Sequence, residues 1–153
     1  MCGIYALLCS QTNCIEKGVV ETSFQTGKKR GPEFSSFSSP CKDLYIGFHR
    51  LAINGIDEIS NQPLVKKNYS LVCNGEIYNH KDIFKNQQIK PETNSDCEAI
   101  LGIYERNGPM CVHMLNGPFS IILYDSKEKV LFVARDPYGV RPLYECVYED
   151  NTM

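Results

Sequence analysis

Short runs of apolar and β-branched residues, bounded by turn-forming residues, recur along the chain. Runs of this length and composition are typical of β-strands. The segments FSIILYD and VLFVARD are separated only by the polar SKEK, a spacing that predicts an antiparallel hairpin. We expect strands at Gly3–Leu8, Leu44–Ile53, Ser70–Asn74, Phe119–Asp125, Val130–Ala134 and Leu143–Tyr148.

The segment PETNSDCEAILGIYERNGP has the strongest helical pattern. Ser95 and Glu98 have the spacing of a capping box, and Asn107-Gly108-Pro109 is expected to end the helix. A shorter helix is expected around Tyr78–Phe84. One face of the longer helix is apolar and is formed by Cys97, Ile100, Leu101 and Tyr104.

The stretch from Thr22 to Pro40 is rich in Ser, Gly, Lys and Pro, which predicts a loop or a poorly ordered segment. No repeat and no linker divides the chain. Its 153 residues are enough for one domain, residues 1–153, with one active site.

Charge and hydropathy exclude several classes of protein. The net charge is −2 and no basic stripe is present, so neither nucleic acid nor a membrane surface is the expected partner. No apolar run approaches the ~20 residues of a membrane span, and the N-terminus lacks a secretory signal. We therefore expect a cytoplasmic protein that acts on a small molecule or another protein.

The chain has eight cysteines but no C-x-x-C motif, and its three histidines form no ligand-like pair. This pattern favours free thiols in a reducing compartment, without a disulfide framework and without a metal site.

Cys2 stands directly behind Met1. If Met1 is removed, one residue carries both a thiol and a free α-amino group, whose pKa is about 7.7–8.0 and which can accept the thiol proton. The alternative is that Cys2 is a small apolar residue at the start of a strand. Its position alone does not decide between these interpretations.

An attack by Cys2 on an amide would need donors for the oxyanion that forms. The side-chain amide of Asn74 and the backbone N–H of Gly75 could supply them, although Asn-Gly is more often a simple turn. A zwitterionic substrate would also need one cation, such as Arg50, and carboxylates such as Asp96 and Glu76. Taken singly, Arg50 could be a surface charge and Asp96 a residue that favours a helix start.

A series of motifs in a fixed order resembles the glutamine amidotransferase domain of class II, whose nucleophile is an N-terminal cysteine. NGEIYNH and FHRLAI make the chain more similar to asparagine synthetase than to amidophosphoribosyltransferase or glucosamine phosphate synthase. The resemblance covers nearly the whole chain and is carried by MCGIYALL, RGPE, GFHRLAING, NQPL, NGEIYNH, SDCEAILGIY, LNGPFSIILYD and ARDPYGVRPLY.

This resemblance implies an α+β fold of the N-terminal-nucleophile hydrolase type, a four-layer αββα sandwich of antiparallel sheets. It implies that Cys2 attacks the side-chain amide of glutamine and that Asn74 and Gly75 form the oxyanion hole. A glutamyl thioester would then be hydrolysed to glutamate after ammonia leaves. The implied glutamine-binding residues are Arg50, Leu51, Ala52, Ile53, Asn54, Asn74, Gly75, Glu76 and Asp96.

The ammonia would supply asparagine synthesis by an ATP-dependent synthetase domain or chain. The sequence has no Ser-Gly-Gly-x-Asp-Ser-like phosphate loop, so this domain is expected to be absent here. We expect no cofactor for the chain itself; ATP and Mg would serve only the separate synthetase.

The chain departs from the family in two places. Residues 29–33 read Lys-Arg-Gly-Pro-Glu where the family usually has His-Arg-Gly-Pro-Asp, and the family's domain continues past the RPLY segment, whereas this sequence stops at Met153. Truncation of the fold at its C-terminus is therefore one expectation. It leaves open the alternative of a catalytically silent module that docks on a synthetase partner.

Overall fold

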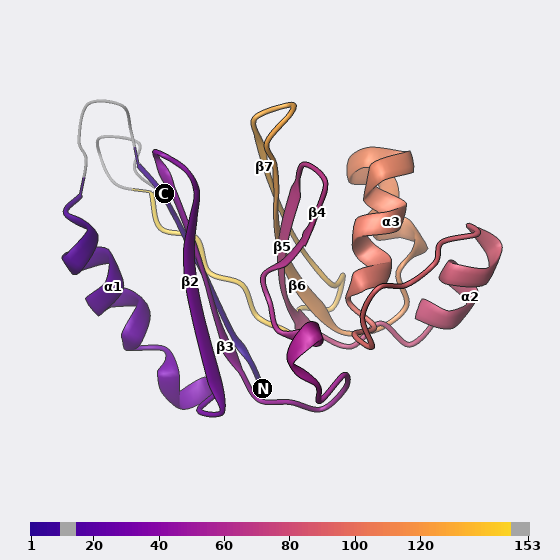
Figure 1. The fold of residues 1–153 in the computed structure, drawn as a ribbon, viewed down its shortest axis with the longest axis horizontal. Helices are drawn as coiled ribbons and strands as arrows, with labels where there is room; N and C mark the ends of the chain where they lie inside the picture. The colour runs from indigo at the N-terminus through magenta and orange to yellow at the C-terminus, as the bar shows by residue number, and fades with distance from the viewer. Residues whose placement is uncertain (10–14, 148–153) are drawn as a thin grey trace.

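Two antiparallel sheets lie face to face between two helical layers (Figure 1). The computed structural model describes residues 1–9 and 15–147. Helix α1 (Lys17–Gln25) covers one sheet, while α2 (His80–Asn86) and α3 (Glu98–Asn107) lie on the outer side of the other. This arrangement confirms the predicted α+β, four-layer αββα sandwich.

The first sheet has the strand order β1-β3-β2. Its strands are β1 (Gly3–Leu8), β2 (Phe34–Cys41) and β3 (Leu44–Arg50). In the antiparallel register Gly3 lies opposite His49. The residue before β1 and the last residue of β3, Cys2 and Arg50, are thereby brought to the same end of the sheet.

The second sheet has the order β4-β5-β6-β7. Its strands are β4 (Leu64–Lys66), β5 (Tyr69–Gly75), β6 (Phe119–Asp125) and β7 (Val130–Arg135). Strands β6 and β7 form the predicted hairpin. At its turn the Asp125 carboxylate accepts the backbone N–H groups of Lys127 (2.9 Å) and Glu128 (3.2 Å).

Three apolar cores separate the four layers. The core between the sheets contains Phe48 from β3 and Val72 from β5, and Val20 of α1 packs on the outer face of the first sheet. The largest core lies between the second sheet and α3. Each large apolar side chain buried in this way contributes about 1.5–3 kcal/mol to folding.

Helix α3 confirms the predicted helix and its apolar face, since Cys97, Ile100, Leu101 and Tyr104 are all buried. The predicted capping box is wrong. The Glu98 carboxylate instead accepts the backbone N–H groups of Glu92 (2.8 Å) and Thr93 (2.7 Å), and no side chain caps the helix. Helix α2 lies close to the range expected for the shorter helix, and a 3₁₀ segment, η3 (Gly108–Met114), follows α3.

The expectation of a loop between Thr22 and Pro40 is wrong. This range includes the end of α1, the 3₁₀ turn η1 (Lys28–Arg30) and most of β2. Strand β2 tolerates its many serines because it is an edge strand, and Ser35 Oγ bonds to His49 Nδ1 at 2.8 Å.

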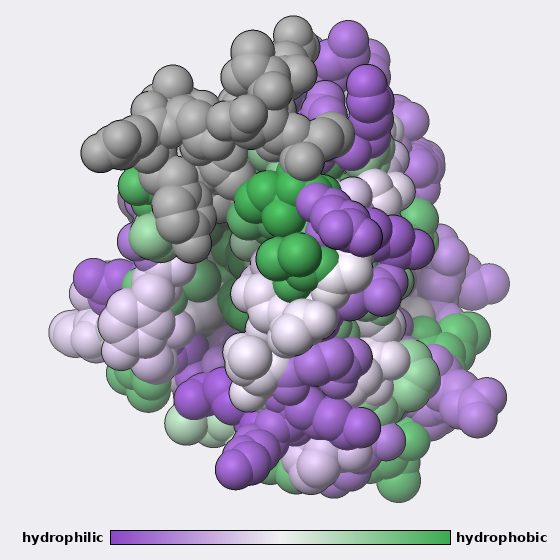
Figure 2. Space-filling model, turned by 90° about the vertical axis from the view of Figure 1, so that its left-hand side faces the viewer, coloured by the Kyte–Doolittle hydropathy of each residue, from purple (hydrophilic) through white to green (hydrophobic). Residues whose placement is uncertain are grey.

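Figure 2 shows the outer face of the molecule that carries α1. This face is mostly hydrophilic and has a hydrophobic cluster beside the residues drawn in grey.

One predicted strand is too long, and another is not observed among the described residues. Strand β3 ends at Arg50, and residues 51–53 leave the sheet. The strand predicted over Leu143–Tyr148 is not present in residues 143–147, whereas Tyr148 lies outside the described residues. No described strand pairs with residues 143–147, and Tyr144 is 90% exposed. An apolar segment does not become a β-strand unless its backbone hydrogen-bonds to a neighbouring strand.

The cysteines within the described ranges, seven of the eight, are free thiols, as predicted; Cys14 lies outside those ranges. Among the described helices, none has the length and apolar character needed to cross a membrane.

Candidate active site

A cavity of about 50 Å³ opens where the start of β1, the ends of β3 and β5, and the segment before α3 meet. Every residue that the sequence predicts for the site lines it. These residues are Cys2, Arg50, Leu51, Ala52, Ile53, Asn54, Asn74, Gly75, Glu76 and Asp96.

The Cys2 thiol is half-buried and is held by the backbone of Leu51. Its Sγ lies 3.4 Å from Leu51 O, to which the thiol donates, and 3.4 Å from Leu51 N, from which it accepts. Arg30 Nε donates to the carbonyl oxygen of Cys2 at 3.4 Å. Cys2 packs against the core between the sheets and also lines the cavity, so it has both an apolar environment and access to a ligand.

Cys73 and Cys97 also line the cavity. Both are almost fully buried, and a hydrogen bond with Cys73, together with burial, raises the pKa of the Cys97 thiol well above its usual range. A thiol with a raised pKa is a poor nucleophile because little thiolate is present. This environment leaves Cys2 as the best placed of the three cavity cysteines for covalent chemistry.

Asn74 and Gly75, the last residues of β5, present hydrogen-bond donors to the cavity. Asn74 is 6% exposed, and within the described part of the chain its side-chain amide has no hydrogen-bond partner. The Glu76 N–H donates to Pro118 O in the loop before β6 (2.9 Å). Because N–H groups alternate between the two edges of an antiparallel strand, the Gly75 N–H points away from β6. Strand β4 reaches only Leu71 on that side, so no strand covers Gly75 there.

The missing side chain of Gly75 serves packing with β6 and its preceding loop. A Cβ atom at this position would lie 2.3 Å from Pro118 O and 2.7 Å from Phe119 Cα. The neighbouring backbone therefore occupies the space that a side chain would need.

Arg50 is 7% exposed, so the alternative of a surface charge is wrong. Its guanidinium donates to the carbonyl oxygens of Asp57 (3.0 Å) and Gly55 and to Asn61 Oδ1. These contacts shape the loop of residues 51–61. All three acceptors are neutral groups, and within the described residues no carboxylate forms an ion pair with Arg50, which leaves a buried positive charge for an anionic group.

Asp96 supplies a buried negative charge from the segment that precedes α3. It is 5% exposed, and its Oδ2 accepts the backbone N–H of Ile77 at 2.6 Å. Helix α3 begins at Glu98, so Asp96 lies outside the helix rather than in its first turn. The hydrogen bond fixes the carboxylate at the wall of the cavity.

Sequence reasoning missed two groups that organise the site. Arg141 Nη2 lies 3.6 Å from Glu76 Oε1, and the Gln62 side chain donates to Cys73 O (3.1 Å) and accepts the Cys73 N–H. Gln62 precedes β4 and thus bonds to β5 beyond the last residue that β4 pairs with, Leu71. Both residues fall in motifs noted in the sequence, NQPL and RPLY, but spacing along the chain gives no signal for these distant contacts.

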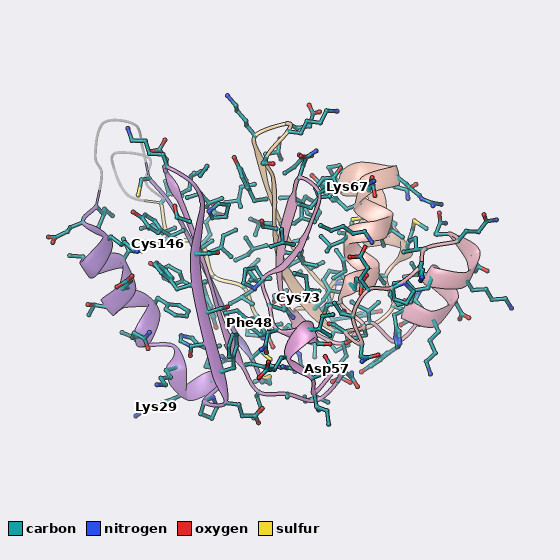
Figure 3. All side chains as sticks on the ribbon, in the orientation of Figure 1. Lys29, Phe48, Asp57, Lys67, Cys73 and Cys146 are labelled. Atoms are coloured by element: carbon teal, nitrogen blue, oxygen red, sulfur yellow. The ribbon has the colours of Figure 1, made fainter. Side chains whose placement is uncertain are left out.

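The segment that departs from the family pattern holds the cavity loop. Glu33 Oε2 accepts the Ala52 N–H (2.9 Å), and a Cβ on Gly31 would lie 2.3 Å from His49 O. Lys29 is exposed and points outward (Figure 3), and it does not line the cavity. Within the loop of residues 51–61, the Asp57 carboxylate (labelled in Figure 3) accepts the backbone N–H of Ser60 at 3.0 Å.

Comparison with known proteins gives a consistent result. A family model described as a glutamine amidotransferase domain matches residues 1–153. An asparagine synthetase [glutamine-hydrolyzing] of Sandersonia aurantiaca is 40% identical over 94% of this chain, and a probable one of Dictyostelium discoideum is 36% identical over 100%.

The matches to these two relatives cover 28% of their length, so the chain spans little more than a quarter of them. Among solved structures, a glutamine phosphoribosylpyrophosphate amidotransferase from B. subtilis matches 90% of this chain and 32% of its own, with a TM-score of 0.56 and 19% identity. This likeness supports the fold.

Proposed function

Because the chain belongs to the glutamine amidotransferase family, we propose that it hydrolyses glutamine to glutamate and ammonia through a thioester on Cys2. One observation carries the proposal: separate segments of the chain bring a thiol, two hydrogen-bond donors, a buried cation and a buried carboxylate to one cavity. Each of these groups has one duty in the reaction.

Glutamine binds through its charged α-groups. Arg50 receives the α-carboxylate and Asp96 the α-ammonium, since each charge is buried and lacks a partner of opposite sign among the described residues. Residues 51–54 and Glu76 line the remaining wall. The side-chain amide then lies toward Cys2.

Removal of Met1 gives Cys2 a free α-amino group. This amine takes the thiol proton, and the sulfur attacks the amide carbon. The oxygen gains negative charge, which the Asn74 amide and the Gly75 N–H stabilise. The tetrahedral intermediate collapses as the nitrogen takes the proton and leaves as ammonia. Water then attacks the thioester and regenerates the thiol with glutamate as product.

We propose further that the ammonia supplies an ATP-dependent synthetase domain or chain that forms asparagine, for which ATP and Mg would be needed there. The relatives that the chain matches are glutamine-hydrolyzing asparagine synthetases, which supports this acceptor. We place the reaction in the cytoplasm, where Cys2 stays reduced.

The test is ammonia release from glutamine by the purified chain, with the mass of its N-terminus measured on the same sample. Activity is expected only after loss of Met1, and Cys2→Ala should eliminate it. Cys2→Ser should be nearly as damaging, because a hydroxyl ionises less readily than a thiol. An active chain that keeps Met1, or an active Cys2→Ala chain, would overturn the mechanism. A processed wild-type chain that binds glutamine without hydrolysing it would favour the silent module.

A further inference from the structure

The loop after β7 is organised around one buried carboxylate. Asp136 is 2% exposed, and its oxygens accept four backbone N–H groups, those of Phe119 (3.3 Å), Tyr138 (3.1 Å), Val140 (3.0 Å) and Arg141 (3.0 Å). Ser120 Oγ donates to Arg141 O at 2.6 Å. The main chain of Arg141 is therefore fixed before any ligand binds.

The guanidinium of Arg141 lines the cavity, and its donors are poorly used. Nη1 donates to Met1 Sδ at 2.9 Å, Nη2 lies 3.6 Å from Glu76 Oε1, and the buried Nε has no partner in the part of the chain that the structure describes. A thioether is a weak acceptor. The planar fork of a guanidinium is suited to a carboxylate, and the side chain is only 16% exposed.

The contacts of Arg141 place this charge at the end of the cavity where the chemistry would occur. Met1 is bonded to Cys2, and Glu76 directly follows the oxyanion residue Gly75. In the proposed reaction the side-chain end of the bound molecule begins as a neutral amide. After water attacks the thioester, the C–S bond breaks, the sulfur takes up a proton, and this end becomes a carboxylate with one negative charge.

We propose that Arg141 binds the carboxylate that hydrolysis creates, and so retains the product glutamate after ammonia has left. The inference rests on the proposed function, because it assigns the Cys2 end of the cavity to the side chain of the substrate. Removal of Met1 takes away the thioether that Nη1 contacts and makes this donor available to the product.

The test compares glutamate with glutamine in a chain that cannot turn over. In the Cys2→Ala background, with loss of Met1 checked by mass, calorimetry measures the Kd of both ligands. Arg141→Met should weaken glutamate binding by at least about tenfold, because it removes charge-assisted hydrogen bonds, while glutamine binding changes much less. Arg141→Lys keeps the charge and should recover part of the loss.

Arg106→Gln is the matched control, since this arginine lies near the end of α3 and bonds to Gln87 on the surface. It should leave both Kd values unchanged. Equal weakening of both ligands by Arg141→Met, or no weakening of glutamate, would overturn the inference. If Arg141→Met does not fold, Arg141→Lys still tests the inference. Unchanged Kd values for both glutamate and glutamine in Arg141→Lys would overturn the need for a guanidinium fork.

The outcome is separable from that of the proposed function. A wild-type chain that does not hydrolyse glutamine, combined with Arg141-dependent glutamate binding, would contradict the function and still support Arg141 as the group that binds the side-chain carboxylate. Hydrolysis together with glutamate binding that is independent of Arg141 would do the opposite.

Discussion

Asn74 can be assigned either to catalysis or to the end of a strand, and its environment separates the two. The side chain is buried at the cavity with no hydrogen-bond partner among the described residues. A side chain that only shaped a turn would bond to the nearby backbone. The unpaired amide therefore favours a role in which its partner is the substrate oxygen.

Asn74→Ala should lower kcat by roughly 10²–10³-fold, with a smaller change in KM, because the oxygen is charged only as Cys2 attacks. Steady-state kinetics of ammonia release measure both constants, and melting temperature is recorded on the same samples. Asn74→Asp should be at least as harmful, since it places a negative charge at the oxyanion. A less stable Asn74→Ala chain with normal kcat would contradict the catalytic role.

Asp96 gives the cleanest test of substrate recognition. Asp96→Asn keeps an oxygen for the Ile77 N–H but removes the charge that would pair with the α-ammonium. KM for glutamine should rise about tenfold or more, with a smaller effect on kcat. The control is Asp82→Asn, which alters an exposed carboxylate in the first turn of α2.

An unchanged KM in Asp96→Asn would show that the carboxylate only holds the Ile77 backbone. Arg50 is less suitable for this test because its guanidinium also shapes the loop of residues 51–61. Arg50→Ala should raise KM and also lower the free energy of unfolding.

At the scale of an element, the approach of β5 to β6 depends on Gly75. Gly75→Ala would place a Cβ 2.3 Å from Pro118 O, so the strand must shift, and the free energy of unfolding should fall by about 1–3 kcal/mol. Activity should fall with it, because the same shift moves the Gly75 N–H that we assign to the oxyanion hole. Denaturant unfolding and kcat are the measurements.

The matched control is Gly18→Ala in α1, where an added Cβ meets nothing within 4 Å. This change should leave activity intact and raise the free energy of unfolding by up to about 1 kcal/mol, because alanine favours a helix. A Gly75→Ala chain as stable and active as this control would refute the assigned packing role.

The loop held by Asp136 should respond to pH in one direction. Burial alone would raise the pKa of Asp136, but the backbone N–H groups of Arg141, Val140, Phe119 and Tyr138 outweigh it and lower the pKa below its usual value. A lowered folded-state pKa means that the ionised form stabilises the fold. This contribution is present above about pH 4, the unfolded-state value, and is lost as pH falls through the folded-state pKa.

The difference in melting temperature between wild type and Asp136→Asn should therefore be large near pH 7 and shrink below about pH 4. Asp82→Asn should follow the wild-type curve more closely at every pH. A difference between wild type and Asp136→Asn that grows in acid would show that the carboxylate does not stabilise the loop in its charged form.

Sequence patterns predicted the buried elements better than the exposed ones. Strand β6 follows from an apolar run, helix α3 from apolar residues at helical spacing, and the hairpin from a short polar turn. Strand β2 was missed because half of its residues are serine, and its place in the sheet depends on pairing with β3. A serine-rich edge strand has no run of apolar residues, so it leaves no hydrophobic signal in the sequence even though its partner strand follows directly.

For the whole molecule, motifs indicated the lining of the cavity, but not how its groups are held. The sequence could not show that Arg50 would bond to loop carbonyls, or that Gln62 would bond to β5 in place of a strand. Nor did it indicate Arg141, whose role depends on a contact with Glu76 across 65 positions of the chain. These contacts form only when the loops around the cavity take up their folded positions.

The position of the cavity links ligand binding to the stability of the entire sandwich. Cys2 and Arg50 come from the first sheet, and Asn74 comes from the second, so glutamine bound as proposed would contact both. At 100 times its Kd, a ligand that binds only the native chain stabilises it by about 2.7 kcal/mol. In the Cys2→Ala chain, glutamine should therefore slow amide hydrogen exchange in β3 and β5 by the same free energy. Slower exchange in only one of these strands would show that the sheets open independently, so that the ligand holds one layer rather than joining two.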